Sequence, residues 1–284
     1  MIKDVTIGLL VLIIVIEIAW IFRDSLGITM ESFENSNGPM SLQGDSPDFT
    51  LEYPATDKTE MTPDEDEVWM TSLTAADQRA RRGQNCLPTY QQAGPFGTTV
   101  FTTTKSCEDG MAHTRPGDRI YIPDNINTVM RSDTIRHELV HVYQRRNPGA
   151  WKTFYRRSWS YEVFVDPPAD LPKELIDGRR ANPDTTNDMG GSWACWLRRY
   201  WTIPIYKDNY NPRLRDTKVI FWDSWRKEAL TEPPSDWTAF FGTPGQPEHP
   251  NEIAACLLVA EDTSSEAGRR LMTWWASQGL ALAG

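Results

Sequence analysis

The segment 133–146, Asp-Thr-Ile-Arg-His-Glu-Leu-Val-His-Val-Tyr-Gln-Arg-Arg, constrains the fold more than any other stretch of this chain. Its two histidines, His137 and His141, are four residues apart. In a helix this spacing places both side chains on one face, about 40° apart at ~100° per residue, so both imidazoles can reach one metal ion. The pattern therefore predicts a helix with a metal-binding face.

The other side of the same helix is apolar. Ile135, Leu139 and Val142 lie there, and a helix with such a stripe packs against a core. Asp133 is the expected N-cap, and the sequence Asn-Pro-Gly at 147–149 predicts the end of the helix. We expect a helix with one face in the core and the other available to zinc.

A catalytic zinc site needs a third protein ligand, because such sites usually bind three side chains and leave one position to water. The continuation x-x-G-x-x-H is absent after the second histidine, which favours a carboxylate as the third ligand. Glu252 is the preferred candidate because it opens an apolar helix predicted over 251–260. Glu162 is the alternative, and the remaining histidines, His113 and His249, are further alternatives.

Asn251, Glu252 and Ala255, together with the histidine pair, resemble the motifs of the gluzincin metallopeptidases, the thermolysin-like clan. The resemblance covers two short segments. It implies an α+β, zincin-like domain whose H-E-x-x-H helix lies beside a small sheet, with Zn²⁺ bound by the histidine pair and Glu252. The chain departs from the pattern in two ways. The gap before Glu252 is 110 residues long, and Cys256 stands where those proteins often carry an Asp that supports a histidine ligand.

The implied function is a zinc-dependent metalloendopeptidase that cleaves a polypeptide. Glu138 is turned too far round the helix to be an equivalent ligand, so it is expected to act as general base on the zinc-bound water. An oxyanion donor is also implied, and Tyr143, His249 and Tyr161 are candidates among which the sequence does not choose. Two alternatives remain open: a structural or interaction module of a membrane or viral assembly, and zinc-dependent hydrolysis of a non-peptide amide.

The N-terminal residues 5–22 form an apolar run of about 27 Å at ~1.5 Å per residue, near the minimum for crossing a bilayer. Lys3 and Arg23 flank this run, whereas Glu17 within it is costly in lipid. No small-x-small cleavage site follows, so an uncleaved transmembrane anchor over 1–23 is preferred to a signal peptide. We expect a single-pass membrane protein whose domain lies outside the bilayer, on a side that the flanking charges do not decide.

The net charge of −10 is concentrated near the N-terminus. Residues 24–78 contain thirteen acidic residues and one lysine, so the rest of the chain is close to neutral. Residues 24–61 are polar and acidic and predict a flexible tether, which leaves 62–284 as the catalytic domain. The near-neutral domain has no basic patch or stripe, which argues against nucleic acid as a partner.

The four cysteines, Cys86, Cys107, Cys195 and Cys256, contain no C-x-x-C pair, so a second zinc site is not expected. Two disulfides suit an oxidising compartment, with Cys86 and Cys107 the natural partners by proximity. Four buried thiols are the alternative. Ten of the twelve tryptophans lie within 151–275, where core filling is preferred to an aromatic substrate groove.

Strands are expected over 98–104 and 118–122, and an exposed edge there would align an extended peptide by backbone hydrogen bonds. The segments 200–206 and 218–222 are expected to pair as a hairpin. Further helices are expected over 62–82, part of 151–165, 171–176 and 264–278.

Overall fold

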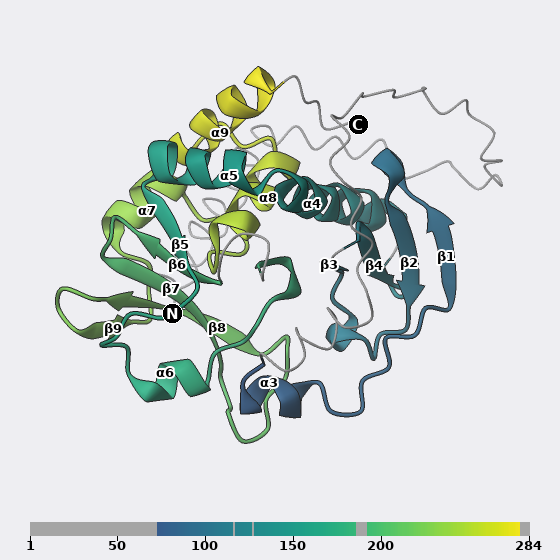
Figure 1. Ribbon diagram of the computed structural model, residues 1–284, viewed down its shortest axis with the longest axis horizontal. Coiled ribbons are helices and arrows are strands. Elements are labelled where there is room, and N and C mark those ends of the chain that lie inside the picture. The colour runs from purple at the N-terminus through teal and green to yellow at the C-terminus, as the bar shows by residue number, and fades with distance from the viewer. Residues whose placement is uncertain (1–72, 116, 127, 186–191, 279–284) are drawn as a thin grey trace, which may run out of the picture. The chain divides into compact units, whose positions relative to one another are not determined.

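The computed structural model describes residues 73–115, 117–126, 128–185 and 192–278 (Figure 1). Within these residues the chain forms an α+β fold with two separate sheets. The long helix α4 (Thr128–Arg146) carries the histidine pair and packs against strand β4 (Arg119–Pro123) and helix α8 (Pro250–Val259). This packing places the middle of the chain beside its C-terminal part.

The first sheet has four strands in the order β1-β2-β4-β3. Strands β2 (Thr99–Thr103) and β4 are parallel, and β1 (Tyr90–Ala93) and β3 (His113–Arg115) pair with them in antiparallel fashion. The strands expected over 98–104 and 118–122 are confirmed to within one residue. Val142 of α4 packs with the buried side chains of this sheet, which confirms the apolar face of the helix.

The second sheet has five antiparallel strands in chain order. Its strands are β5 (Tyr161–Phe164), β6 (Trp193–Trp196), β7 (Tyr200–Tyr206), β8 (Thr217–Asp223) and β9 (Glu228–Leu230). The predicted hairpin is confirmed as the β7–β8 pair. The other helices are α3 (Ala75–Ala80), α5 (Pro148–Phe154), α6 (Lys173–Asp177), α7 (Ser235–Phe241) and α9 (Glu266–Ser277), with a π-helical turn over Tyr155–Trp159.

Tryptophan side chains fill the core between the second sheet and the helices. All the tryptophans between 151 and 275 are buried except Trp225, which is exposed, and Trp274, which is partly buried. Large aromatic surfaces removed from water supply much of the driving force for packing. Core filling is therefore confirmed as the role of most of them.

Helix α4 begins five residues before the predicted N-cap. Thr128 is its first residue, so Asp133 lies inside the helix, and the N-cap prediction is wrong. Residues 128–132 contain neither Pro nor Gly, and the helix therefore continues through them. Asp133 forms an ion pair of 3.6 Å with Arg136 one turn on, which a residue within a helix can do.

The predicted fold is also corrected in two larger respects. A single small sheet beside the helix was expected, but the segment between the histidine pair and Glu252 builds a second, larger sheet, which explains the 110-residue gap. No helix in the described ranges has the length and apolar character needed to span a membrane, so a transmembrane helix is not part of the described fold. The expected span 5–22 and tether 24–61 lie outside the described residues.

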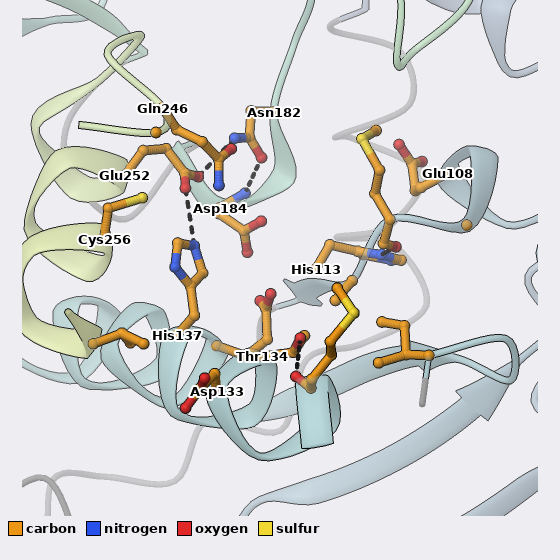
Figure 2. Close-up of a pocket in the computed structure, with 18 of the residues that line it drawn as sticks. Glu108, His113, Asp133, Thr134, His137, Asn182, Asp184, Gln246, Glu252 and Cys256 are labelled. Carbon is orange, nitrogen blue, oxygen red and sulfur yellow. Dashed lines mark hydrogen bonds and ion pairs between the residues drawn. The ribbon is translucent and has the colours of Figure 1, made fainter. Parts of the chain in front are cut away.

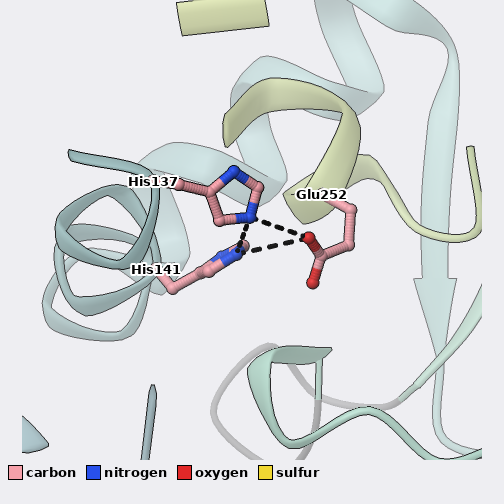
Figure 3. A group of neighbouring side chains, drawn as sticks. All are labelled: His137, His141 and Glu252. Atoms are coloured by element: carbon pink, nitrogen blue, oxygen red, sulfur yellow. Dashed lines mark hydrogen bonds and ion pairs between the residues drawn. The ribbon is translucent and has the colours of Figure 1, made fainter. Parts of the chain in front are cut away.

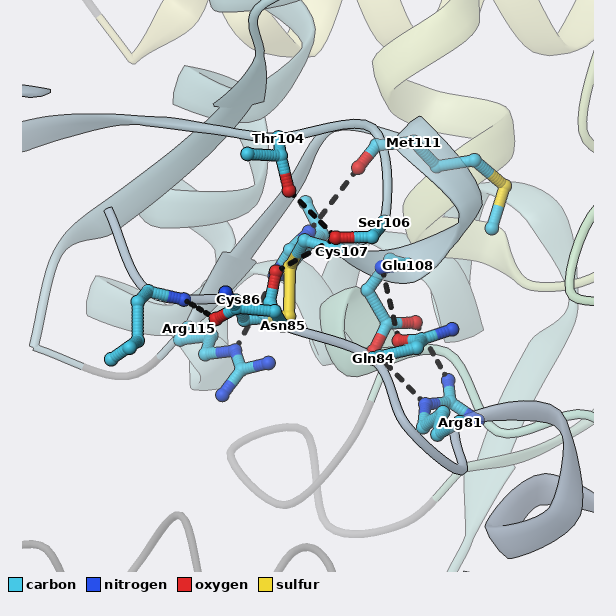
Figure 4. Close-up of a disulfide and its surroundings, with 12 residues drawn as sticks. Arg81, Gln84, Asn85, Cys86, Thr104, Ser106, Cys107, Glu108, Met111 and Arg115 are labelled. Carbon is cyan, nitrogen blue, oxygen red and sulfur yellow. Dashed lines mark hydrogen bonds and ion pairs between the residues drawn. A yellow bond between two sulfur atoms is a disulfide. The ribbon is translucent and has the colours of Figure 1, made fainter. Parts of the chain in front are cut away.

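A disulfide joins Cys86 to Cys107, as predicted, whereas Cys195 and Cys256 are free thiols, so two disulfides are not formed (Figure 4). Cys107 precedes Glu108, which is buried and accepts two hydrogen bonds of 3.0 Å from Arg81. The bridge therefore holds the chain beside a buried ion pair.

Arg81, Glu108, Asp77 and Tyr206 form a buried group that we call the α3 ion cluster. Arg81 also donates to Asp77 at 3.1 Å, and the Tyr206 hydroxyl donates to the same carboxylate at 2.7 Å. Asp77 accepts a further bond from the backbone N–H of Ala181, whose carbonyl accepts from Arg81. The cluster thus fixes the backbone of the loop that begins at Ala181, and this loop leads to the site described next.

Candidate metal centre

Three predicted ligands meet at the contact between α4 and α8 (Figure 3). The Nε2 atoms of His137 and His141 are 3.0 Å apart. The Glu252 Oε2 atom lies 3.1 Å from the first nitrogen and 3.4 Å from the second. His141 and Glu252 are fully buried, and His137 is partly exposed. The structure therefore brings together side chains that are more than a hundred residues apart in sequence.

The spacing of these atoms fits a tetrahedral metal ion. An ion with bonds of about 2.05 Å to nitrogen holds any two of its ligand atoms about 3.3 Å apart. The observed separations of 3.0, 3.1 and 3.4 Å lie close to that value. Two imidazoles and one carboxylate are also a ligand set that suits zinc. The residues present therefore fit the ion that the sequence predicted.

Buried hydrogen bonds behind His141 fix which ring nitrogen carries its proton. The chain of bonds starts at the Asp184 carbonyl, which can only accept, so the Asn251 Nδ2 donates to it at 3.2 Å. The Asn251 Oδ1 then accepts from the Tyr155 hydroxyl at 3.1 Å. Gln144 Nε2 donates to that hydroxyl at 3.1 Å and to the Asn251 carbonyl at 3.0 Å.

The Gln144 Oε1 must therefore be the acceptor that faces His141. It lies 2.8 Å from the His141 Nδ1, which donates. The Nε2 of the same ring is then left with a lone pair, and that atom points at His137 and Glu252. The surroundings of His141 thus select the tautomer that a metal ligand requires.

The second carboxylate oxygen of Glu252, Oε1, accepts a hydrogen bond from a neighbouring loop. Asn182 Nδ2 donates to Glu252 Oε1 at 2.7 Å and to Glu248 at 3.0 Å. Burial alone would raise the pKa of Glu252, but the charges and hydrogen bonds of His141 and His137 outweigh burial and hold this pKa well below its usual value. The carboxylate is therefore kept ionised at the place where a cation would bind.

Cys256 lies one helical turn after Glu252 on α8 and beside His137 (Figure 2). Burial lowers the pKa of His137, but the interactions of the ring with the Cys256 thiol and with the Glu252 carboxylate outweigh burial and raise the pKa well above its usual value. The residue that departs from the gluzincin pattern thus occupies a supporting position at the histidine.

Glu138 is buried beside the ligands, but its carboxylate is not part of the group formed by His137, His141 and Glu252. Its Oε2 is buried and has no hydrogen-bond partner among the described residues. Burial raises the pKa of Glu138 to about 8, and the nearby Asp184 carboxylate adds to the shift. The two carboxylates and the His141 ring come within 4.8 Å of one another.

The centre opens into a cleft of about 890 Å³. His137, Glu138 and Glu252 line the cleft, together with His113 of β3 and Glu108 (Figure 2). His113 is buried and stacks on a tyrosine of β4. A molecule in this cleft would therefore lie beside His137, Glu138 and Glu252 together.

The predicted oxyanion donors lie elsewhere, and none of the three lines this cleft. Tyr143 packs on two tryptophans, and the hydroxyl of Tyr161 faces Thr202 at 3.3 Å inside the core. His249 caps α8, its Nδ1 accepting from the Asn251 N–H at 3.2 Å. Its Nε2 is buried without a partner in the described part of the chain.

Glu162, the alternative third ligand, is not among the side chains that meet at the histidine pair. It lies on β5, an edge strand of the second sheet, and pairs with Arg198 at the surface at 2.7 Å. It belongs to neither group of potential ligands found in the described residues.

The expected edge for an extended peptide is also corrected. Strands β2 and β4 are both interior strands of the first sheet, so neither offers an edge. Strand β3 does lie at the edge on the cleft side, but the Thr114 N–H donates to Asp184 at 2.7 Å. The Thr114 carbonyl accepts from Arg145 at 3.4 Å. Both backbone groups of Thr114 are therefore already bonded.

Sequence reasoning missed the side chains that hold the ligands in place. Gln144 had a detectable signal, because residues three apart in a helix are neighbours and Gln144 is three residues after His141. Asn182 and Asp184 had none, since they lie in a segment, 179–184, that has no periodic pattern. Their position depends on tertiary contacts alone.

No family model, curated protein or solved structure matches this chain. A His–His–Glu group does not by itself identify a gluzincin, so the resemblance of the motifs stays a prediction.

Proposed function

We propose that this protein is a zinc-dependent peptidase in which His137, His141 and Glu252 hold the ion. One observation carries the proposal. Three potential ligand atoms face one another at 3.0, 3.1 and 3.4 Å, beside Glu138, whose buried Oε2 has no hydrogen-bond partner among the described residues. A ligand set, a candidate base and a cleft thus occur together, and this combination is what metal-assisted hydrolysis requires.

Zn²⁺ bound there would supply Lewis-acid chemistry, polarising a carbonyl and bringing the pKa of a water molecule towards neutrality. The chain's own residues do the rest. Glu138 takes up the proton of the attacking water and later delivers it to the leaving amine. Gln144 holds His141 in the tautomer with its lone pair towards the ion, and Asn182 orients the carboxylate of Glu252.

Metal binding is tested first. We expect the purified chain to bind one zinc ion per molecule and to unfold at a higher temperature when zinc is added. Zinc at 100 times its Kd would stabilise the folded state by about 2.7 kcal/mol. His141→Ala should abolish both effects. If neither stoichiometric zinc nor a thermal shift is found, the proposal fails.

Cleavage of a peptide library is tested next, with wild type against Glu138→Gln. The variant should bind zinc but cleave peptides about 10²–10⁴-fold more slowly, the usual effect of losing a general base. Glu174→Gln is the matched control, because Glu174 is an exposed carboxylate on α6. If the protein binds zinc and cleaves no peptide, the peptidase assignment is wrong and the centre has a structural role.

A further inference from the structure

A second hollow of about 530 Å³ continues the cleft beyond the metal centre. The two hollows share the side chains at their junction. The shared residues are Met111, Arg180, Arg215, Gly245 and Gln246. An extended molecule that reaches His137 and Glu252 can therefore also enter the second hollow.

The charged side chains of the second hollow are mostly cations. Arg180, Arg215 and Lys218 line it with a single carboxylate, Glu248. Arg180 is buried and forms its ion pair with that carboxylate. Arg215 and Lys218 are exposed, and no described carboxylate lies within ion-pair distance of either one.

The neighbouring acidic side chains already have other partners. Asp216 pairs with Lys207 at 2.7 Å, and Asp109 accepts the Leu214 N–H at 2.9 Å. Arg215 itself donates one hydrogen bond, to the Gly110 carbonyl at 2.5 Å, which leaves its charge uncompensated. Two positive charges are therefore available beyond the metal centre, that of Arg215 at the junction of the two hollows and that of Lys218 in the second hollow.

Arg180 adds donors at the junction of the two hollows. Its Nε is buried and has no hydrogen-bond partner in the described ranges. Its Nη1 has only the Met111 sulfur at 4.0 Å, which is a weak acceptor. A buried guanidinium with unused donors is costly unless a further acceptor completes it, and a carboxylate or carbonyl oxygen can do so.

We infer that the second hollow binds a carboxylate group of the polypeptide substrate, through Arg215 and Lys218. This inference rests on the proposed function, because it assigns a preference to the same cleft. Leu214, Val219 and Phe221 supply apolar surface in this hollow, which suits the methylene groups of an acidic side chain. The carboxylate can belong to an Asp or Glu side chain or to the C-terminus of a peptide.

Binding is measured apart from cleavage, by fluorescence anisotropy with zinc-loaded protein that carries Glu138→Gln. The probes are labelled decapeptides with one Glu at successive positions, and matched peptides with Gln instead. A third set without acidic side chains has either a free or an amidated C-terminus. We expect a carboxylate in one register to tighten binding about tenfold over its amide counterpart.

The variant Arg215→Ala/Lys218→Ala should reduce that preference to less than about twofold and leave zinc affinity unchanged. Arg213→Ala is the control, because Arg213 is an exposed cation two residues away that lines neither hollow. Equal binding of Glu and Gln peptides, with equal binding of the two C-terminal forms, overturns the inference. A preference that survives in the double variant also overturns it.

The two proposals fail in different ways. A protein that binds zinc and cleaves peptides without an acidic preference keeps its proposed function and loses this inference. A protein that prefers carboxylate peptides through Arg215 and Lys218, yet cleaves none, keeps the binding site and loses the peptidase assignment. The two C-terminal forms separate a side-chain carboxylate from a terminal one.

Discussion

Two buried polar groups of this protein look alike in composition and differ in how their atoms are paired. The α3 ion cluster joins Arg81 to two carboxylates, and each contact has a donor facing an acceptor. In the metal centre two ring nitrogens and a carboxylate oxygen, each a potential metal ligand, face one another, and Glu138 adds an oxygen without a partner among the described residues. The contacts of the first group are made within the chain, whereas we propose that a cation completes the second.

This difference indicates which buried polar groups of a protein to examine for chemistry. Buried polar atoms that satisfy one another report on folding, because removing any one of them leaves another unpaired. Buried potential ligand atoms that gather beside a cleft, next to an oxygen with no partner among the described residues, indicate a binding site. Burial and charge alone do not separate the two cases.

The largest effect on the difference between the two groups is expected from Arg81→Leu. It leaves Glu108 and Asp77 buried without their cation, so we expect a loss of about 3–5 kcal/mol in unfolding free energy, measured by urea denaturation. Zinc affinity of the molecules that remain folded should be unchanged. Arg82→Leu, at the exposed neighbour, should cost less than about 0.5 kcal/mol.

If Arg81→Leu instead weakened zinc binding as much as it weakened folding, the two groups would not be separable. The route for such coupling would be the loop at 181–182, because the α3 ion cluster holds Ala181 and the next residue, Asn182, donates to Glu252. That result would contradict the view that the α3 ion cluster serves folding and the metal centre serves binding.

A smaller effect is expected from Gln144→Leu, which removes the acceptor of the His141 proton. Zinc affinity, measured by competition with a chromophoric chelator, should fall about 10–100-fold, the usual cost of losing a residue that orients a ligand. Gln144→Glu is the matched control. It loses the same two donated bonds but keeps the acceptor, so its zinc affinity should stay within a few-fold of wild type.

Nitrogen NMR of the metal-free protein gives a second readout of the same prediction. The His141 ring should carry its proton on Nδ1 in wild type and in Gln144→Glu, and should populate both tautomers in Gln144→Leu. Equal zinc affinities for the Leu and Glu variants would show that Gln144 does not position the histidine.

The sequence was a good guide wherever structure follows from local pattern. The strands near 98–104 and 118–122, the hairpin and the histidine-bearing helix have periodicities that their own residues set. The His137–His141 pair needs only helix geometry, and Glu252 followed from its place at the start of an apolar helix. These parts were predictable because neighbours in sequence decide them.

The remaining features depend on contacts between distant segments. Asn182 reaches Glu252 because the α3 ion cluster fixes the loop at Ala181. No local sequence pattern indicates a contact of this kind. Strands β5, β6 and β9 of the second sheet were missed because each has only three or four residues, too few to show an alternating pattern. None of the candidate oxyanion donors lines the cleft, because the direction of a side chain in a core depends on tertiary packing.

The smallest effect in this comparison is expected from Tyr206→Phe. The Tyr206 hydroxyl donates to Asp77 at 2.7 Å, but that oxygen also accepts from Arg81 and from the Ala181 N–H, so Asp77 stays paired when the hydroxyl is lost. We expect a loss of about 1 kcal/mol in unfolding free energy, a typical value for one hydrogen bond, with zinc affinity unchanged. A loss near that of Arg81→Leu would mean that the hydroxyl, and not the guanidinium, holds the cluster together.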